Sequence, residues 1–154
     1  MRTFGLAAFT GLLLWVVRST FVIVRVRGSS MAPTLRDGDR ILAVRHLPIR
    51  RNRVVVVHAG PHVRPASVTS DGYLVKRVHA VPGDVVPARD YPALRATPKV
   101  PEGCLILRGD NADHSFDSRH AGYFPAAAVR GTAVRVLPRP GSAAKIRGEQ
   151  GEEK

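Results

Sequence analysis

The chain begins with a long apolar stretch. Residues Phe4–Val17 carry no charge, and Phe21–Val24 extend the stretch to 21 positions if Arg18 reaches toward the lipid headgroups. A helix needs about 20 apolar residues to cross the hydrocarbon core of a bilayer, and Trp15 suits the membrane interface. No small-x-small cleavage site follows, so a removable signal peptide is disfavoured. We therefore predict a retained single-pass transmembrane helix, with residues 1–24 as a membrane anchor.

The charges around this anchor leave its orientation open. Arg18, Arg25 and Arg27 follow the apolar stretch, whereas Arg2 and the terminal amine precede it. Read literally, the positive-inside rule puts the following domain in the cytoplasm. A basic folded domain can bias this count without having been retained inside. We predict a cell-membrane protein with its domain on the extracytoplasmic side, and the cytoplasmic orientation remains the alternative.

Beyond the anchor, apolar and β-branched residues recur in short runs separated by turn signals such as Pro82-Gly83. These runs lie at residues 21–27, 40–45, 53–58, 72–78, 83–86, 104–108 and 131–137. No long 3.6-residue apolar period follows residue 30, which disfavours a helical bundle. The pattern predicts a mainly β fold, with a compact and mostly antiparallel β domain over residues 25–137. Residues 138–154 have almost nothing to bury and are predicted to form a disordered polar tail.

Composition narrows the choice of partners. A length of 154 residues suits a single domain. The 24 basic and 12 acidic residues give a net charge of +12, which favours an anionic neighbour such as a membrane surface or a nucleic acid. Aromatic residues make up only 6% of the chain and few of them interleave with arginine. We therefore expect the lipid bilayer as the anionic partner and no nucleic acid.

Residues that form disulfides or hold metals are sparse. Cys104 is the single cysteine, so no intrachain disulfide can form. The six histidines lack the spacing of a zinc site. The acidic loop from Asp110 has Ser115 at the position where a calcium loop needs glycine. We expect neither a metal nor another cofactor.

Two residues are candidates for nucleophilic chemistry. Ser30 ends an extended run just before Met31 and Pro33, where a tight turn presents its hydroxyl, although an isolated serine there is more often a simple turn residue. Lys76 lies inside an apolar strand; it either alternates toward water or is desolvated, which lowers its pKa and suits a general base. Together a turn serine and a desolvated lysine form the Ser-Lys variant of nucleophile and base.

A third polar segment follows the apolar run that ends at Arg108. Its small and charged residues, from Gly109 to Gly122, can supply a hydroxyl that orients the lysine and a salt bridge that holds the loop. Asp117 and Arg119 suit that salt bridge.

Three motifs together resemble the ordered signature of type I signal peptidases. They are Gly-Ser-Ser-Met-Ala-Pro-Thr-Leu from Gly28, Lys-Arg-Val with Pro-Gly-Asp from Lys76, and Gly-Asp-Asn-(x)3-Ser-x-Asp-Ser-Arg from Gly109. The resemblance covers about residues 20–137, and the short spacing is similar to compact members such as mitochondrial inner-membrane peptidases and small actinobacterial relatives. It implies a signal-peptidase-like β domain, which the self-cleaving (LexA-like) repressors resemble.

The resemblance also implies roles for the matching residues. Ser30 matches the nucleophile, Lys76 the general base, and Ser115 the serine that orients the lysine. Asp117 and Arg119 match a structural ion pair. The other matches are Asp110 and Asn111 in a turn that shapes the site, and Met31, Leu35, Leu74 and Val75 in the pocket for the small residue before the cleaved bond.

The chain departs from the family pattern at two places. Gly28 stands where some relatives have a serine whose hydroxyl helps to stabilise the oxyanion, which leaves the Ser30 N–H as one donor. Losing one such donor costs about 3 kcal/mol of barrier in other enzymes. Asn52-Arg53 replaces the usual Gly-Asp before the valine-rich run, which puts the local turn in doubt.

These observations predict a membrane-bound serine endopeptidase that removes signal peptides from exported precursor proteins through an acyl-enzyme. Its expected partners are signal-peptide-bearing precursors and the lipid bilayer. A maturation protease dedicated to a single precursor is the alternative within the same family. A membrane-tethered basic binding module, in which Ser30 and Lys76 are structural, is the alternative from another class.

Overall fold

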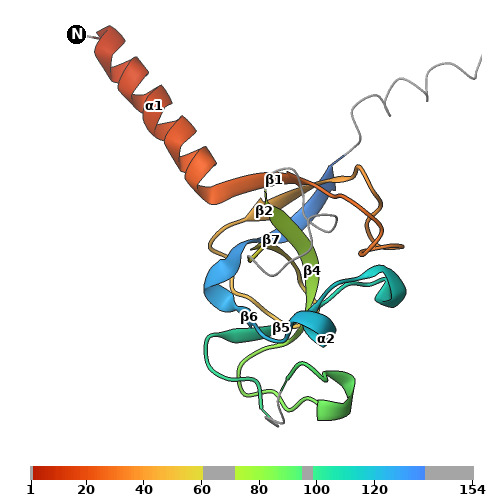
Figure 1. The fold of residues 1–154 in the computed structure, drawn as a ribbon. Coiled ribbons are helices and arrows are strands. Elements are labelled where there is room, and N and C mark those ends of the chain that lie inside the picture. The colour runs from red at the N-terminus through yellow and green to blue at the C-terminus, as the bar shows by residue number, and fades with distance from the viewer. Residues whose placement is uncertain (1, 61–71, 95–98, 138–154) are drawn as a thin grey trace, which may run out of the picture.

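A computed structural model describes residues 2–60, 72–94 and 99–137. Figure 1 shows one helix that projects from a curled β domain. The predicted polar tail, residues 138–154, lies outside the described residues.

Helix α1 (Arg2–Thr20) is followed directly by strand β1 (Phe21–Arg25). The prediction counted a helical span through Val24, and the structure corrects it: the last four apolar residues are extended. Val22 and Val24 are β-branched, which favours a strand, and Val24 is buried in the core of the domain. Among the described residues, the structure contains no helix whose length and apolar character suffice for a membrane crossing. The predicted transmembrane helix is therefore not supported.

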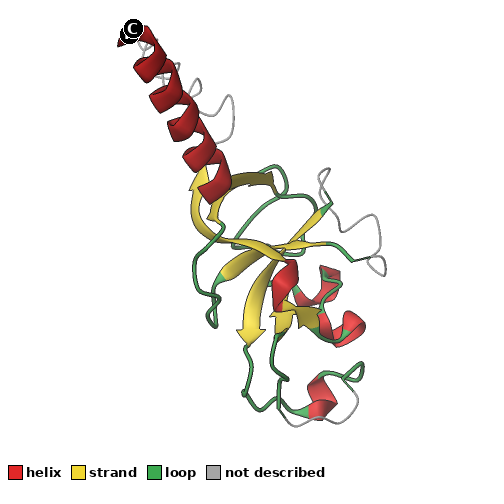
Figure 2. Cartoon of the chain, turned by 90° about the vertical axis from the view of Figure 1, so that its left-hand side faces the viewer, coloured by secondary structure: helices red, strands yellow, loops and turns green. Residues whose placement is uncertain are grey.

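The strands are β1, β2 (Arg40–Val44), β3 (Val54–His58), β4 (Tyr73–Ala80), β5 (Cys104–Arg108), β6 (Phe124–Pro125) and β7 (Val129–Leu137). They form one seven-stranded sheet in the order β1-β2-β7-β3-β4-β5-β6, and all paired neighbours are antiparallel. Figure 2 shows the sheet curling on itself beside α1. The short helices are η2 (Ala88–Asp90), η3 (Ala112–His114), α2 (Ser118–Ala121) and η4 (Ala126–Ala128). The prediction of a mainly β, antiparallel fold is confirmed.

Residues 83–86 are not the strand that the sequence predicted. The Asp84 N–H donates to the Val81 carbonyl oxygen (3.1 Å), so the segment starts with a tight turn. Its contacts with the chain at Val100 are two hydrogen bonds, from the Gly83 N–H to the Val100 carbonyl oxygen (2.9 Å) and from the Val100 N–H to the Asp84 carbonyl oxygen (2.8 Å). Val85 makes only an isolated bridge to Lys99. The segment cannot extend into a longer strand because Pro87 has no N–H to donate.

The core covers both faces of the central strands. Val55, Val56 and Val57 are all 0% exposed, which explains the uninterrupted valines of β3. Val55 and Val57 pack with Leu74 in one cluster, whereas Val56 packs with Val75 in another. Because side chains alternate along a strand, Lys76 lies on the same face of β4 as Leu74.

Candidate active site

Lys76 is a buried lysine in the middle of β4. Its side chain is only 1% exposed, so the face opposite Val75 is not open to water. The ammonium nitrogen Nζ donates hydrogen bonds to Ser30 Oγ (2.9 Å) and to Ser115 Oγ (3.2 Å). Ser30 lies in the connection between β1 and β2, and Ser115 lies between η3 and α2. The fold thus brings together three residues from distant parts of the chain.

The surroundings of Lys76 favour its uncharged form. Burial lowers the pKa of Lys76 from 10.5 to about 8, with Arg119 acting in the same direction and the carboxylates of Asp117 and Asp110 opposing it. A lysine with this pKa has an uncharged fraction near neutral pH. It can therefore accept a proton from a neighbouring hydroxyl.

Asp117 organises the loop beside Lys76. Its carboxylate is 0% exposed and accepts hydrogen bonds from Ser115 Oγ (2.8 Å), the Gly109 N–H (2.9 Å) and Arg119 Nε (2.9 Å). Burial alone would raise the pKa of Asp117, but the donors from Arg119, Gly109 and Ser115 outweigh it and lower the pKa to about 2. Since Ser115 donates its proton to Asp117, its oxygen remains an acceptor for Lys76. Asp117 and Arg119 are thus paired, and they orient Ser115.

Gly109 is a site residue that our sequence analysis did not single out. A Cβ built on Gly109 would lie 2.5 Å from the Ser30 carbonyl oxygen and closer still to Ser115 Oγ. The Ser30 carbonyl oxygen also accepts a hydrogen bond from the Asn111 N–H (3.0 Å). The loop after β5 therefore holds the serine-bearing loop at van der Waals distance. The signal was present in the sequence as the glycine of the Gly-Asp-Asn motif.

Gly28 and Ser30 differ in the availability of their N–H groups. Gly28 has a φ of 77°, a conformation that favours glycine, and its N–H donates to Asp37 Oδ1 (2.7 Å). Within the described parts of the chain, the Ser30 N–H donates no hydrogen bond. The Ser30 N–H is therefore available to a ligand, whereas the Gly28 N–H is occupied.

Asp110 forms an ion pair that our sequence analysis did not predict. Arg77 donates from Nε to Asp110 Oδ1 (2.8 Å) and from Nη2 to Oδ2 (2.6 Å), and its Nη1 donates to the Asn52 carbonyl oxygen (2.7 Å). Burial raises the pKa of Asp110, but hydrogen bonds from Arg77 and Thr34 outweigh it and lower that pKa. Arg77 follows Lys76 and points to the other face of β4. This pair therefore links β4 to the turn that contains Asn111 without contacting Lys76.

The four predicted pocket residues are all buried, but they do not form one group. Met31, Leu35 and Val75 pack together in one core cluster. Leu74 packs in the other cluster, on the opposite face of the sheet. The structure therefore brings three of these residues together and separates the fourth from them.

A serine hydroxyl in contact with a buried lysine amine, next to a free backbone N–H, is an arrangement that serine hydrolases with a lysine base use. The chain matches the sequence model of a family described as signal peptidase, peptidase S26, over residues 1–92 and 87–137. This protein therefore belongs to the S26 signal peptidase family.

Named relatives agree with this assignment. The mitochondrial inner membrane protease subunit 1 of Schizosaccharomyces pombe is 32% identical over 126 residues, which cover 78% of this chain and 76% of the relative. Signal peptidase I of Bacillus caldolyticus is 32% identical over 135 residues, covering 64% of this chain and 69% of the relative. Signal peptidase I of Streptococcus pneumoniae is 45% identical over 65 residues, covering 41% of this chain. That match spans only 27% of the streptococcal protein's own length.

Proposed function

We propose that the protein is a serine endopeptidase that removes signal peptides, with Ser30 as nucleophile and Lys76 as general base. The 2.9 Å contact between Lys76 Nζ and Ser30 Oγ is the observation that carries this proposal. Burial of Lys76 supports it further, because a base must be uncharged before it can accept the serine proton. Ser115 and Asp117 act as positioning residues that fix the direction of the amine.

In the proposed reaction, the amine of Lys76 carries out every proton transfer. Neutral Lys76 accepts the hydroxyl proton while Ser30 Oγ bonds to the scissile carbonyl carbon, and the Ser30 N–H stabilises the oxyanion. When the carbon–nitrogen bond breaks, Lys76 returns the proton to the leaving amine. A water then attacks the carbonyl carbon of the ester while Lys76 takes one of its protons. Lys76 returns this proton to Ser30 Oγ as the bond between Oγ and the carbonyl carbon breaks, which frees the carboxylic acid and the Ser30 hydroxyl.

The substrate is proposed to bind as an added strand. The pairing of β4 with β5 includes no residue of β4 before Arg77, so the edge beside Leu74 and Val75 is unpaired among the described strands. An extended peptide can use such an edge for backbone hydrogen bonds. The dense packing around Met31 and Leu35, both at most 3% exposed, favours a small residue before the cleaved bond.

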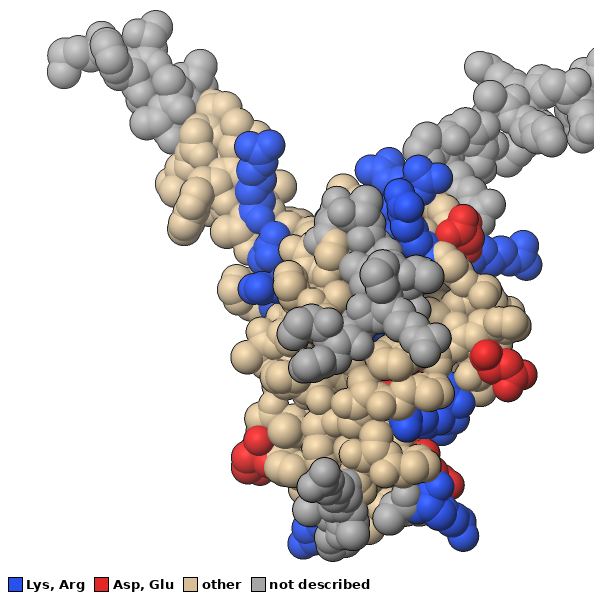
Figure 3. Space-filling view, in the orientation of Figure 1, with Lys and Arg blue, Asp and Glu red and all other residues tan. Residues whose placement is uncertain are grey.

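We also infer that the protein acts at a membrane. Helix α1 exposes large apolar side chains, namely Phe9, Leu12, Leu13, Leu14, Trp15, Val16 and Val17. Figure 3 shows lysine and arginine side chains close to the junction between the helix and the β domain. An apolar helix beside basic residues suits contact with an anionic lipid surface. The name of the S. pombe relative likewise puts that protein at an inner membrane.

The decisive experiment is cleavage of a signal-peptide precursor by the wild type, Ser30→Ala and Lys76→Ala. Both variants should lose at least about a thousandfold in kcat/KM, because nucleophile and base act as a unit. Ser29→Ala is the control for Ser30→Ala, because Ser29 is the exposed serine next to it in the chain. Lys99→Ala is the control for Lys76→Ala, because it removes a lysine from an exposed position. Equal processing by all five proteins would exclude the proposed mechanism.

A further inference from the structure

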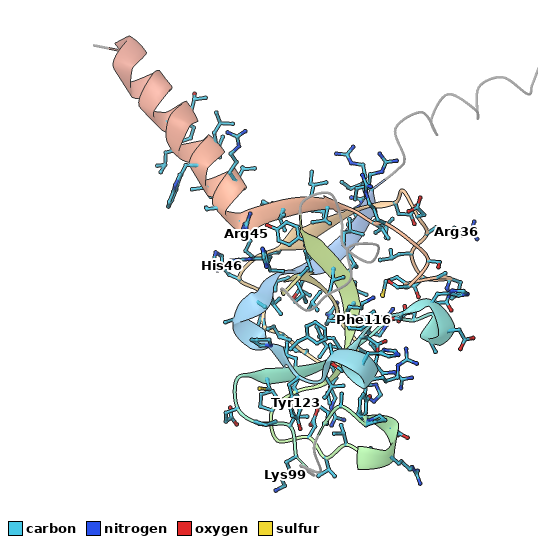
Figure 4. The ribbon with its side chains drawn as sticks, viewed as in Figure 1. Arg36, Arg45, His46, Lys99, Phe116 and Tyr123 are labelled. Carbon is cyan, nitrogen blue, oxygen red and sulfur yellow. The ribbon has the colours of Figure 1, made fainter. Side chains whose placement is uncertain are left out.

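The connection between β2 and β3 concentrates positive charge. Residues 45–53 read Arg-His-Leu-Pro-Ile-Arg-Arg-Asn-Arg and contain no acidic residue. Figure 4 shows Arg45 and His46 at the foot of α1, where the Arg45 N–H donates to the Thr20 carbonyl oxygen (2.8 Å). The start of this connection therefore lies next to the end of the apolar helix.

Two arginines of this connection are not neutralised. Arg51 pairs with Asp84. Arg50 and Arg53 are exposed and have no ion-pair partner among the described residues. Two guanidinium groups without a carboxylate are ready to bind an anion.

Backbone hydrogen bonds fix the positions of Arg50 and Arg53 in the turn before β3. The Arg53 N–H donates to the Arg50 carbonyl oxygen (3.3 Å), which closes a turn. Asn52 adopts a positive φ of 64° in this turn, and its N–H donates to the Val78 carbonyl oxygen (2.8 Å). The Val78 N–H in turn donates to Arg53 (2.9 Å). The two arginines are therefore held just before the start of β3 by hydrogen bonds to β4.

A pocket of about 270 Å³ opens beside the turn. Its lining residues are Leu47, Pro48, Arg50, Arg53, Thr132 and Val134. The pocket thus combines two cations with an apolar wall, and none of the described residues that line it is acidic. Leu47 and Val134 are 40% and 48% exposed, so the apolar wall is accessible.

Thr132 supplies an independent sign of a ligand. It is only 3% exposed, and its Oγ1 has no hydrogen-bond partner among the described residues. Val55 is the register partner of Thr132 on one side and of Lys76 on the other, so all three side chains point to the same face of the sheet. A buried hydroxyl without a partner is destabilising, and a ligand with acceptor oxygens would complete it.

We propose that this pocket binds a phosphate group. Arg50 and Arg53 donate to the phosphate oxygens, and the Thr132 hydroxyl donates a further hydrogen bond. The planar guanidinium fork matches the geometry of phosphate oxygens. Leu47 and Val134 contact the carbon atoms attached to the phosphate. A phospholipid headgroup and free phosphate share this chemistry. The connection that carries Arg50 and Arg53 starts at the end of α1, whose apolar side chains are exposed, and this favours the lipid.

The test uses the 154-residue chain with three probes: inorganic phosphate at constant ionic strength, phosphatidylglycerol vesicles and phosphatidylcholine vesicles. Backbone amide NMR shifts at Thr132 report phosphate, and co-sedimentation reports vesicles. Arg50→Gln with Arg53→Gln should weaken binding at least about tenfold, and isosteric Thr132→Val about threefold or more. The matched control, Arg36→Gln with Arg89→Gln, removes the same charge from exposed sites outside the pocket and should change binding less than about twofold.

The outcomes are distinct. Vesicle binding that depends on Arg50, Arg53 and Thr132, without saturable binding of inorganic phosphate, identifies a lipid headgroup as the ligand. Free phosphate is identified as the ligand if inorganic phosphate binds saturably and this binding depends on Arg50, Arg53 and Thr132, while vesicle binding does not depend on them. Equal weakening by both double variants, or no binding of any probe, overturns the proposal. Ser30→Ala should retain the binding, which separates this proposal from the peptidase function.

Discussion

Two aspartate–arginine pairs flank the proposed active site, and they differ in burial and in what they hold. Asp117 with Arg119 has a fully buried carboxylate that contacts Ser115, the partner of Lys76. Asp110 with Arg77 is partly exposed, with 15% and 30% of the two side chains accessible, and lies toward the other face of β4. The first pair fixes the environment of Lys76, the proposed base. The second pair fixes the turn that contains Asn111, whose N–H donates to the carbonyl oxygen of Ser30, the proposed nucleophile.

Asp117→Asn should produce the largest loss of stability. Removing one partner of a buried ion pair leaves Arg119 and the donors of Ser115 and Gly109 poorly matched, and such changes typically cost about 3–5 kcal/mol. The wild type should lose stability in acid, because the pKa of Asp117 is lowered to about 2: its contribution is full above about pH 4 and disappears as the pH falls toward 2. Denaturant unfolding at pH 3 and pH 7 measures both effects.

The control for this change is Asp113→Asn, an exposed aspartate in η3 of the same loop. It should alter the free energy of unfolding by less than about 0.5 kcal/mol. If both variants lose the same stability, burial of the first pair has no special role.

Lys76→Met should have the opposite effect on stability while removing activity. The pKa of Lys76 falls from 10.5 to about 8 in the folded protein, which corresponds to about 3 kcal/mol lost at pH 7. Methionine fills a similar volume without a charge, so the variant should be more stable than the wild type by up to about that amount.

The gain should depend on pH in a defined direction. The unfolded state holds the lysine proton more tightly than the folded state, so wild-type stability rises between about pH 8 and 10.5 and the advantage of Lys76→Met shrinks there. Unfolding of both proteins at pH 7 and pH 10 measures this difference. A constant gain across that range, or a loss of stability, contradicts a desolvated lysine.

Of the three substitutions, Asp110→Asn should change the free energy of unfolding least. The pair with Arg77 is partly exposed, and an amide still accepts one of its two hydrogen bonds, so we expect a loss of about 1 kcal/mol. Activity should fall about tenfold through kcat with little change in KM, because the loop that places Ser30 becomes less well fixed. An effect as large as that of Asp117→Asn would remove the distinction between the two pairs.

The sequence predicted the strands where short apolar runs met clear turn signals, as in Val54–His58 and Cys104–Arg108. At the end of α1 it supported both a helical continuation through Val24 and a β run over residues 21–27, because an apolar stretch does not by itself distinguish helix from strand. There the burial of Val24 decided the outcome. The strand predicted at residues 83–86 was wrong for a local reason, because Gly83 turns the chain toward Val100.

The candidate site shows a similar division. Local patterns singled out Ser30 and Lys76, the motif order added Ser115, and the structure brings their side chains into contact. Alternation in β4 indicated the direction of Lys76 but not that loops cover that face. The pairing of Arg77 with Asp110 and the tight fit at Gly109 depend on the approach of two distant loops, which no local pattern encodes.

The most direct test of the central claim is the pH dependence of kcat/KM for a soluble signal-peptide substrate between pH 6 and 11. This parameter reports the pKa of the essential base in the free enzyme. An uncharged Lys76 that acts on Ser30 predicts a rate that rises with pH, with an inflection near 8, and then levels off. A rate that does not vary with pH, or an inflection near 10.5, would contradict a buried lysine as the base.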